Sequence, residues 1–294
     1  MSELDDALSG TVEADEEQKI RVAHRRLREV LDRHRDGRDG EDPSDPMTVQ
    51  VMPMVLEIPH DPIPDRRAML EAAATACVAV CLDPRAGEET GGTTGGPDHP
   101  ESSTGTFAEA LMSWYDARIR KVARRARNKK WRDVQALPGV TAEVDGARAR
   151  AFTPCPVSRT PALINRLQIE GTDLVDSPDD AAGTVPEETP VIFVDASLGM
   201  SVGKAAAQVA HGSMLLAAEL PEDAALAWNA AGFPLQVREV DRERFAEVRA
   251  QAETAQQQGS GAADAAAAYA AVVQDAGYTE VAPGSVTVVA LAPM

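Results

Sequence analysis

Three polar side chains that could do chemistry recur at helical spacing between Met200 and His211, in the sequence MSVGKAAAQVAH. Gly203 is expected to open a helix, so that Lys204 lies in its first turn and Gln208 and His211 follow on the same face. An ammonium group at a helix N-terminus attracts anions such as a phosphate or a developing oxyanion. Each residue alone has an ordinary explanation, as a solvated lysine or a packed histidine. Only the three residues together are a candidate functional site.

The same segment superficially resembles the phosphate-binding loop of nucleoside triphosphatases. The stretch from Gly199 to Gly203 is one residue short of the GxxxxGK spacing, and Ala205 stands where a hydroxyl would bind magnesium. We therefore exclude a nucleoside triphosphate site here.

A second polar cluster follows at 274–287, in the sequence QDAGYTEVAPGSVT. Its glycines and Pro283 indicate a tight path into a final strand, on which Asp275 and Thr279 could point to one side. A carboxylate and a hydroxyl can orient and polarise a water molecule, with a nearby imidazole or lysine tuning their proton affinities. A purely structural turn at the strand entry would explain the same residues.

The elements that would position these clusters alternate between strand and helix patterns. In the second half, 191–195 is a short apolar strand, Gly203 to Leu220 is helical, 234–240 alternates like a strand, and 286–291 is a β-branched strand. Each half reads strand, loop, helix, strand, helix, strand. This order predicts an α/β protein of tandem three-layer domains, each a small mixed β-sheet flanked by helices.

An internal repeat relates the two halves. At an offset of 137, residues 55–58 fall on 192–195, with Arg67 on Lys204 and Glu71 on Gln208. At an offset of 114, Trp114 falls on Trp228, and further matches follow at Ile119, Ala123, Arg124, Trp131 and Val134. The two offsets differ by about the length of a Gly/Ser/Thr-rich insertion after Asp83, so a single inserted loop in the first half explains why the offset changes. We favour a tandem duplication.

Residues 119–127 carry two incompatible patterns. Tyr115, Ile119, Val122 and Ala126 are spaced like one face of a helix. The repeat instead aligns this segment with the strand expected around 233–241, and we predict a strand.

Length and composition favour two domains in a reducing compartment. The chain has 294 residues, 44% of them hydrophobic and 26% charged, with three cysteines and an acidic N-terminus that lacks a signal peptide. No apolar run approaches the ~18 residues of a membrane-spanning helix, so we expect a cytoplasmic protein. The sequence predicts four regions. Residues 1–46 form a charged, partly disordered extension with a short amphipathic helix near 15–35, and residues 47–175 form a first domain with a flexible insertion at 84–106. A linker at 176–190 leads to a second domain at 191–294.

The charge is unevenly distributed. The formal net charge is −18, yet 107–134 holds nine basic residues against three acidic ones. From 191 to the end, there are five basic and twelve acidic residues. A concentrated basic patch on an acidic protein is typical of a localised polyanion contact, although a solvated charged surface gives the same pattern.

Together the clusters at 200–211 and 274–287 resemble the archaeal/eukaryotic-type (type 2) peptidyl-tRNA hydrolase family, over roughly Val191 to Pro293. The resemblance implies a small mixed sheet flanked by helices, and cleavage of the ester that joins a peptide to the 3′ end of tRNA, without a metal or organic cofactor. It nominates Lys204, His211, Asp275 and Thr279 as catalytic, with Gly203 and Gln208 binding substrate. The sequence departs from the family in the loop before Gly203, which has fewer lysines and glycines, and at Gly212, where alanine is usual.

The first half lacks this chemistry, because Ala74 falls opposite His211 and nothing in 139–154 matches the run from Asp275 to Thr279. Cys77 and Cys81 have apolar neighbours and are expected to be core thiols rather than metal ligands. We therefore predict a degenerate copy whose basic stretch binds tRNA phosphates, with Trp114, Tyr115 and Trp131 stacking on bases. The residues expected to contact the substrate there are Arg120, Lys121, Arg124, Arg125 and Arg127.

Two other functions remain open at this point. The fold could serve as a non-catalytic RNA- or ribosome-binding protein with an eroded site, or the site could hydrolyse a different acyl ester or amide. A monomer and a homodimer are both compatible with the sequence.

Overall fold

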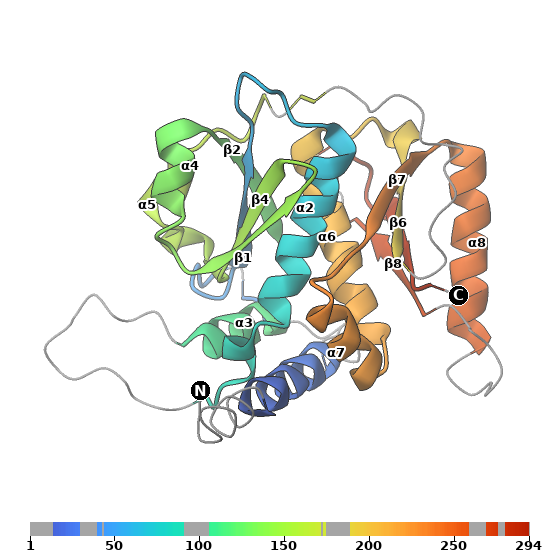
Figure 1. Ribbon diagram of the computed structural model, residues 1–294, viewed down its shortest axis with the longest axis horizontal. Helices are drawn as coiled ribbons and strands as arrows, with labels where there is room; N and C mark the ends of the chain where they lie inside the picture. Colours follow the sequence, from blue (N-terminus) through green and yellow to red (C-terminus); the bar gives the residue numbers. More distant parts are fainter. Residues whose placement is uncertain are drawn as a thin grey trace, which may run out of the picture.

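Two mixed β-sheets stand on either side of a central pair of helices in the computed structural model (Figure 1). The structure describes residues 14–29, 40–42, 44–90, 106–171, 173–174, 189–258, 269–275 and 280–293. In this part of the chain, no helix is long and apolar enough to cross a membrane.

The first half forms a five-stranded sheet of order β2-β1-β4-β3, with the short β5 paired to β1. Strands β1 and β2 are parallel, and the other pairs are antiparallel. The elements are β1 (Gln50–Glu57), α2 (Arg66–Cys81), α3 (Phe107–Asp116), β2 (Lys121–Ala126), α4 (Asn128–Val134), β3 (Gly139–Val144), β4 (Ala147–Phe152), β5 (Cys155–Pro156) and α5 (Ala162–Asn165), with 3-10 turns η1 (Pro84–Gly87) and η2 (Val157–Arg159).

The second half forms a four-stranded sheet of order β7-β6-β9-β8, again with one parallel pair, β6 and β7. Its elements are β6 (Val191–Asp195), η3 (Ala196–Leu198), α6 (Val202–Glu219), α7 (Glu222–Ala230), β7 (Gln236–Val240), α8 (Arg242–Gln258), β8 (Ala270–Gln274) and β9 (Val286–Leu291). Apart from β5, the strands of the two sheets correspond in order. The predicted α/β class, with small mixed sheets flanked by helices, is confirmed.

Each half has more elements than the sequence pattern predicted. The extra helices are α3, α5 and α7. The extra strands β3 and β8 each pair with the last long strand of their sheet, and the short extra strand β5 pairs with β1. Strand β8 was missed because its sequence, AAVVQ, begins in an alanine-rich run that does not favour strands. The β3–β4 hairpin turns at Asp145 and Gly146, both with positive φ, as a two-residue turn requires.

The repeat at an offset of 114 coincides with equivalent positions in the two sheets. Trp114 Nε1 donates to the Arg120 carbonyl at 3.0 Å, and Trp228 Nε1 donates to the Pro234 carbonyl at 2.8 Å, six residues on in each case. Residues 121–126 form strand β2. The prediction of a strand over the competing helix is therefore confirmed for these residues.

The offset of 137 predicted from the sequence is one residue too small for the strands and one residue too large for the helices. Ala123 pairs with Met54 and its counterpart Val237 pairs with Ile192, so the strands correspond at an offset of 138. Helix α2 is capped by Asp65 and α6 by Ser201, an offset of 136. A connection two residues longer before α2 explains the difference, and it places Thr75 rather than Ala74 opposite His211.

One continuous hydrophobic core runs through both halves, because α2 and α6 pack against each other between the sheets. Smaller apolar clusters lie on the outer faces, under α4 and α5 in the first sheet and under α8 in the second. Cys77 and Cys81 are fully buried in the shared core, as expected of core thiols. The predicted domain boundaries remain proposals, and the linker at 176–190 lies largely outside the described residues.

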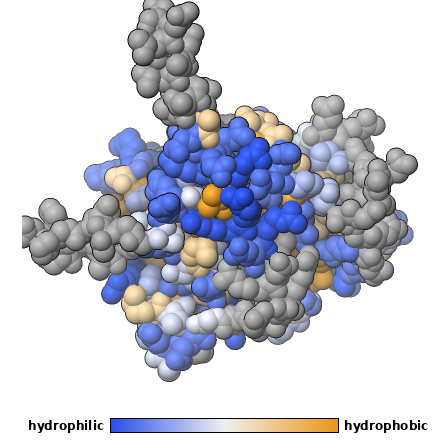
Figure 2. Space-filling view, turned by 90° about the horizontal axis from the view of Figure 1, so that it is seen from below, coloured by the Kyte–Doolittle hydropathy of each residue, from blue (hydrophilic) through white to orange (hydrophobic). Residues whose placement is uncertain are grey.

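A helix over residues 14–29 covers the lower edge of the molecule (Figure 1), on a side whose surface is mainly hydrophilic (Figure 2). It confirms the amphipathic helix predicted in this region. Ala23, His24 and Leu27 are buried, and His24 Nε2 lies 2.9 Å from the Ala217 carbonyl oxygen of α6. Gly87 allows the contact, since a Cβ there would lie 1.8 Å from the Lys19 carbonyl oxygen.

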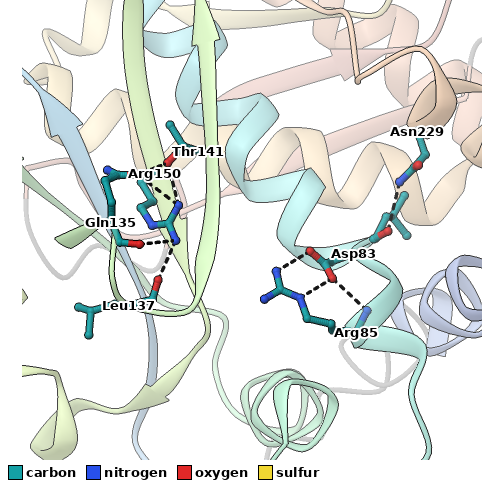
Figure 3. Close-up of polar contacts among 8 residues, drawn as sticks. Asp83, Arg85, Gln135, Leu137, Thr141, Arg150 and Asn229 are labelled. Atoms are coloured by element: carbon teal, nitrogen blue, oxygen red, sulfur yellow. Dashed lines mark hydrogen bonds and ion pairs between the residues drawn. The ribbon is translucent and has the colours of Figure 1, made fainter. Parts of the chain in front are cut away.

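The segment predicted as a flexible insertion, 84–106, is described at both of its ends. Asp83 accepts from the Arg85 backbone amide at 2.9 Å and also pairs with its guanidinium, which starts η1 (Figure 3). The Leu82 carbonyl accepts from Asn229 of α7 at 3.1 Å. Thr106 caps α3 with a capping box, so only 91–105 lie outside the described residues.

Candidate active site

Lysine, glutamine and aspartate side chains meet where α6 passes the end of β8. Lys204 Nζ lies 2.5 Å from Asp275 Oδ2, and Gln208 Nε2 donates to the same oxygen at 2.8 Å. The Lys204 and Asp275 side chains are only 12% and 9% exposed. Two clusters predicted separately from the sequence thus form one site, in which a nearly buried carboxylate is held by an ammonium group and an amide.

The backbone that carries Asp275 is fixed by the β8–β9 ladder. The register shifts between Val273 and Gln274, an irregularity of the kind that redirects side chains next to sites. Beyond it, the Asp275 amide donates to the Ser285 carbonyl at 2.9 Å, and the Gly284 amide donates to the Asp275 carbonyl at 2.8 Å. Asp275 therefore projects from a hydrogen-bonded position immediately after the strand.

Thr287 is a site residue that sequence reasoning did not assign. Its hydroxyl donates to Gln208 Oε1 at 2.6 Å, and it is fully buried on β9. Because the amide oxygen of Gln208 accepts this bond, its NH₂ group is directed toward Asp275. The available signal was a hydroxyl residue inside the apolar strand sequence VTVVAL.

A second carboxylate lies at the beginning of α6. Ser201 caps the helix by accepting from the Lys204 amide at 3.2 Å. Glu280 accepts from both the amide and the hydroxyl of Ser201, at 2.8 and 2.7 Å. Sequence analysis singled out neither residue.

The remaining predicted catalytic positions have different outcomes. His211 is half-buried on α6, three residues beyond Gln208, and Gly203 lies in the first turn of that helix. Thr279 lies outside the described residues. Where α6 carries Lys204 and Gln208, the first half has Ala68 and Ala72 at the cap-aligned positions.

The basic stretch is not one continuous surface, which corrects the expectation from sequence. Arg120 pairs with Glu41 at 2.5 and 2.7 Å and holds the pKa of that carboxyl below its usual range. Lys121 Nζ packs 3.3 Å from Met214 Sδ and 5.0 Å from the Trp114 ring centroid, and burial lowers its pKa. Strand alternation sends neighbouring cations to opposite faces of β2, which the sequence count ignored.

Two further arginines of β2 hold the chain that follows α5. Arg124 donates to the Leu167 carbonyl at 2.9 Å, and Arg125 donates to Gln168 Oε1 at 2.6 Å. Arg127 lies 3.5 Å from His60 Nδ1. The aromatic residues predicted to stack on bases are core residues instead, since Trp114, Tyr115 and Trp131 are at most 5% exposed.

Fold and site together define an α/β protein with two equivalent sheets and a single Lys–Asp–Gln–Thr site among the described residues, in the second half. Residues 189–294 match the family model described as Peptidyl-tRNA hydrolase PTH2. A comparison with curated proteins finds no match. The family match includes Lys204, Gln208, Asp275 and Thr287, and the first sheet lies outside it.

Proposed function

We propose that the chain hydrolyses the ester bond of peptidyl-tRNA and releases the peptide and free tRNA. The family match of the C-terminal region supports this activity. The observation that carries the proposal is the contact of Lys204 and Gln208 with one oxygen of the nearly buried Asp275. A site with both a carboxylate and an ammonium group can serve the two needs of ester hydrolysis, proton transfer from water and stabilisation of an oxyanion.

In the proposed mechanism, Asp275 accepts a proton from the attacking water, whose oxygen bonds to the ester carbonyl carbon. The negative charge that develops on the carbonyl oxygen is stabilised by the Lys204 ammonium group. When the intermediate collapses, the bond to the ribose oxygen breaks and the proton taken up by Asp275 goes to that oxygen. Gln208 keeps the carboxylate oriented through its bond to Oδ2.

His211 and Thr279 complete the proposed set. His211 follows Gln208 on α6 at a spacing that keeps it on the same side of the helix, where it can orient substrate or take part in proton transfer. Thr279, four residues after Asp275 in the chain, would help to position the water. These roles rest on the resemblance to the family.

The test is hydrolysis of purified peptidyl-tRNA by the full chain and by Asp275→Asn. Removing a general base typically costs 10²–10⁴-fold in rate, so we expect turnover to fall at least a hundredfold while tRNA binding is retained. Asp223→Asn is the matched control, because Asp223 is 88% exposed on α7 and lies outside the site. Turnover in Asp275→Asn equal to that of the parent would remove Asp275 from the mechanism.

Lys204→Ala distinguishes this activity from that of a contaminating esterase, because only activity of this chain depends on Lys204. If the parent chain binds tRNA without any turnover, the alternative of a non-catalytic RNA-binding protein replaces the proposal. Turnover of simple acyl esters but not of peptidyl-tRNA would instead indicate a different hydrolase.

We also infer that the chain arose by tandem duplication and that the first half is a degenerate, non-catalytic copy. The corresponding strand orders and the two equivalent tryptophan hydrogen bonds support this origin. The segment that carries Asp275 between β8 and β9 corresponds to the two-residue turn between β3 and β4. The copy therefore has no room for the second polar cluster.

A further inference from the structure

Exposed cations gather at the end of β2 and along α4 in the first half. We call Arg127, Lys129, Lys130 and Arg132 the α4 patch. Lys129, Lys130 and Arg132 are exposed and Arg127 is half-buried. Arg127, Lys129 and Lys130 lie around an open cavity of about 270 Å³, together with Ile58, Arg125, Asn128 and Gln168.

The α4 patch differs from the rest of the basic stretch in how its charges are used. Arg120, Lys121, Arg124 and Arg125 are engaged by other groups of the chain, as described above. In the α4 patch, Lys129 pairs with Asp133 at 2.6 Å but keeps its side chain 79% exposed. An exposed ion pair of this kind is weak, so Lys129 can exchange Asp133 for another anion.

The α4 patch and the candidate active site lie at the same edge of the molecule. Parallel strands β1 and β2 end at one edge of the first sheet, where the β1–α2 connection and α4 follow. Helix α6 also begins at that edge, at the top of Figure 1, close to the start of α2. A single extended ligand can therefore contact both places.

Direct contacts join the two regions through the β1–α2 connection. Arg127 lies beside His60 of this connection. At its far end, Arg66 forms two bonds to Glu239 of β7, at 2.6 and 2.8 Å, and donates to the Met200 carbonyl at 3.1 Å. Met200 immediately precedes the cap of α6, so the β1–α2 connection, which passes beside the α4 patch, is bonded to the segment that leads to Lys204.

The second half, which contains the candidate active site, offers few cations of its own. Among its five basic residues, Lys204 is engaged by Asp275, and Arg244 and Arg249 pair with glutamates on α8. An RNA substrate needs cations along its phosphate backbone as well as a site for its reacting end, because phosphate contacts dominate affinity.

We propose that the α4 patch binds the phosphate backbone of the RNA whose acylated 3′ end occupies the Lys204–Asp275 site. This proposal rests on the proposed function for the identity of the RNA. It replaces the broader expectation for the basic stretch, and it gives the degenerate half a purpose, which is to supply the cations that the second half lacks.

The test compares the double variant Arg127→Gln/Lys130→Gln with the control Arg244→Gln/Arg249→Gln. The control removes two exposed positive charges from α8, on the outer side of the second sheet. Each variant is assayed with peptidyl-tRNA and with a peptidyl ester of adenosine, which has no phosphate backbone. For tRNA, we expect KM to rise at least tenfold in the patch variant with kcat unchanged, and the slope of log affinity against log salt to fall by roughly 1 to 2.

The same experiment contains the contradicting outcomes. Equal KM values and salt slopes in the patch variant and the parent would overturn the proposal, as would an equal loss in the α8 control. An equal loss on the adenosine ester would show that the substitutions act on the site instead. If the parent hydrolyses neither substrate, the proposed function fails, and equilibrium binding of tRNA to the same variants still decides whether the α4 patch binds RNA.

Discussion

Thr287 shows how a single hydroxyl can determine the orientation of a whole site. It donates to Gln208, which donates to Asp275, so three side chains form a directed hydrogen-bond chain with Lys204 at the same carboxylate oxygen. An amide has a donor end and an acceptor end of nearly equal shape, and only its partners decide which way it points. Without the hydroxyl, the two ends of Gln208 would no longer be distinguished on that side.

Replacing Thr287 by valine should lower kcat about tenfold with little change in KM. Valine has a similar shape but leaves the buried Gln208 oxygen without its donor, a loss of about 1–3 kcal/mol in comparable cases. Steady-state kinetics on peptidyl-tRNA measure the effect. Thr287→Ser retains the hydroxyl and should restore kcat, and an equally slow serine variant would show that packing, not orientation, is what Thr287 supplies.

At the scale of elements, helix α6 connects the site to the rest of the protein. Its first turn carries Lys204, its middle packs on both sheets, and its last turns receive His24 from the helix at 14–29. Gly212 lets it approach the second sheet closely, since a Cβ there would lie 3.0 Å from Val288 Cγ1. The glycine found where the family usually has alanine therefore stands at a close helix–sheet contact.

We expect His24 to make the stability of the folded chain sensitive to pH. Burial lowers the pKa of His24 below its ordinary value of 6.5, so the folded state favours the neutral ring. The unfolded chain then binds more protons than the folded chain between the two pKa values. Stability is therefore lost as the pH falls through 6.5 toward the lower folded pKa, by at most about 1.4 kcal/mol per pH unit.

His24→Gln should remove this part of the pH dependence, because glutamine can still donate to the Ala217 carbonyl and does not titrate. Urea unfolding of both proteins between pH 7.5 and pH 5 measures it. As the pH falls, we expect the unfolding free energy of the parent to decrease more than that of the variant. A difference that stays constant over this range would contradict the prediction.

At the scale of the whole molecule, the two halves share one core rather than meeting at a polar interface. Residues of both sheets belong to the same buried cluster, and Ser213 of α6 donates to the Ala74 carbonyl of α2 at 2.8 Å inside it. The buried Glu71 carboxylate accepts from the Val237 amide of the other half at 3.0 Å. Separating the halves would expose apolar surface and leave these polar groups unsatisfied.

We therefore expect the chain to unfold in one cooperative transition. The test uses two variants that each retain a single tryptophan, either Trp114 in the first half or Trp228 in the second. Denaturant titrations followed by tryptophan fluorescence and by far-ultraviolet circular dichroism should coincide within each variant. Fluorescence of Trp114 and Trp228 that changes at separate midpoints, while circular dichroism shows two steps, would mean that the halves are independent domains.

Sequence alone determined the local features of this protein. The spacing of Lys204 and Gln208, the strand at 191–195, the alignment of Trp114 with Trp228 and the polar cluster that contains Asp275 follow from short-range patterns. Periodicity reports which face of an element is apolar, and these elements are long or apolar enough to show it. Strand β8 and the one-residue error in the repeat mark the limit, because alanine-rich segments and connections of unequal length leave the register open.

Tertiary structure alone decided which charges are available and which polar groups meet. The count of basic residues in 107–134 could not separate Arg120, held by Glu41, from the exposed Lys130, because a partner distant in the chain leaves no periodic trace. Thr287 and Gln208 lie 79 residues apart and meet only when β9 packs under α6. Hydrogen bonds act over about 3 Å, so only the packed chain could reveal them.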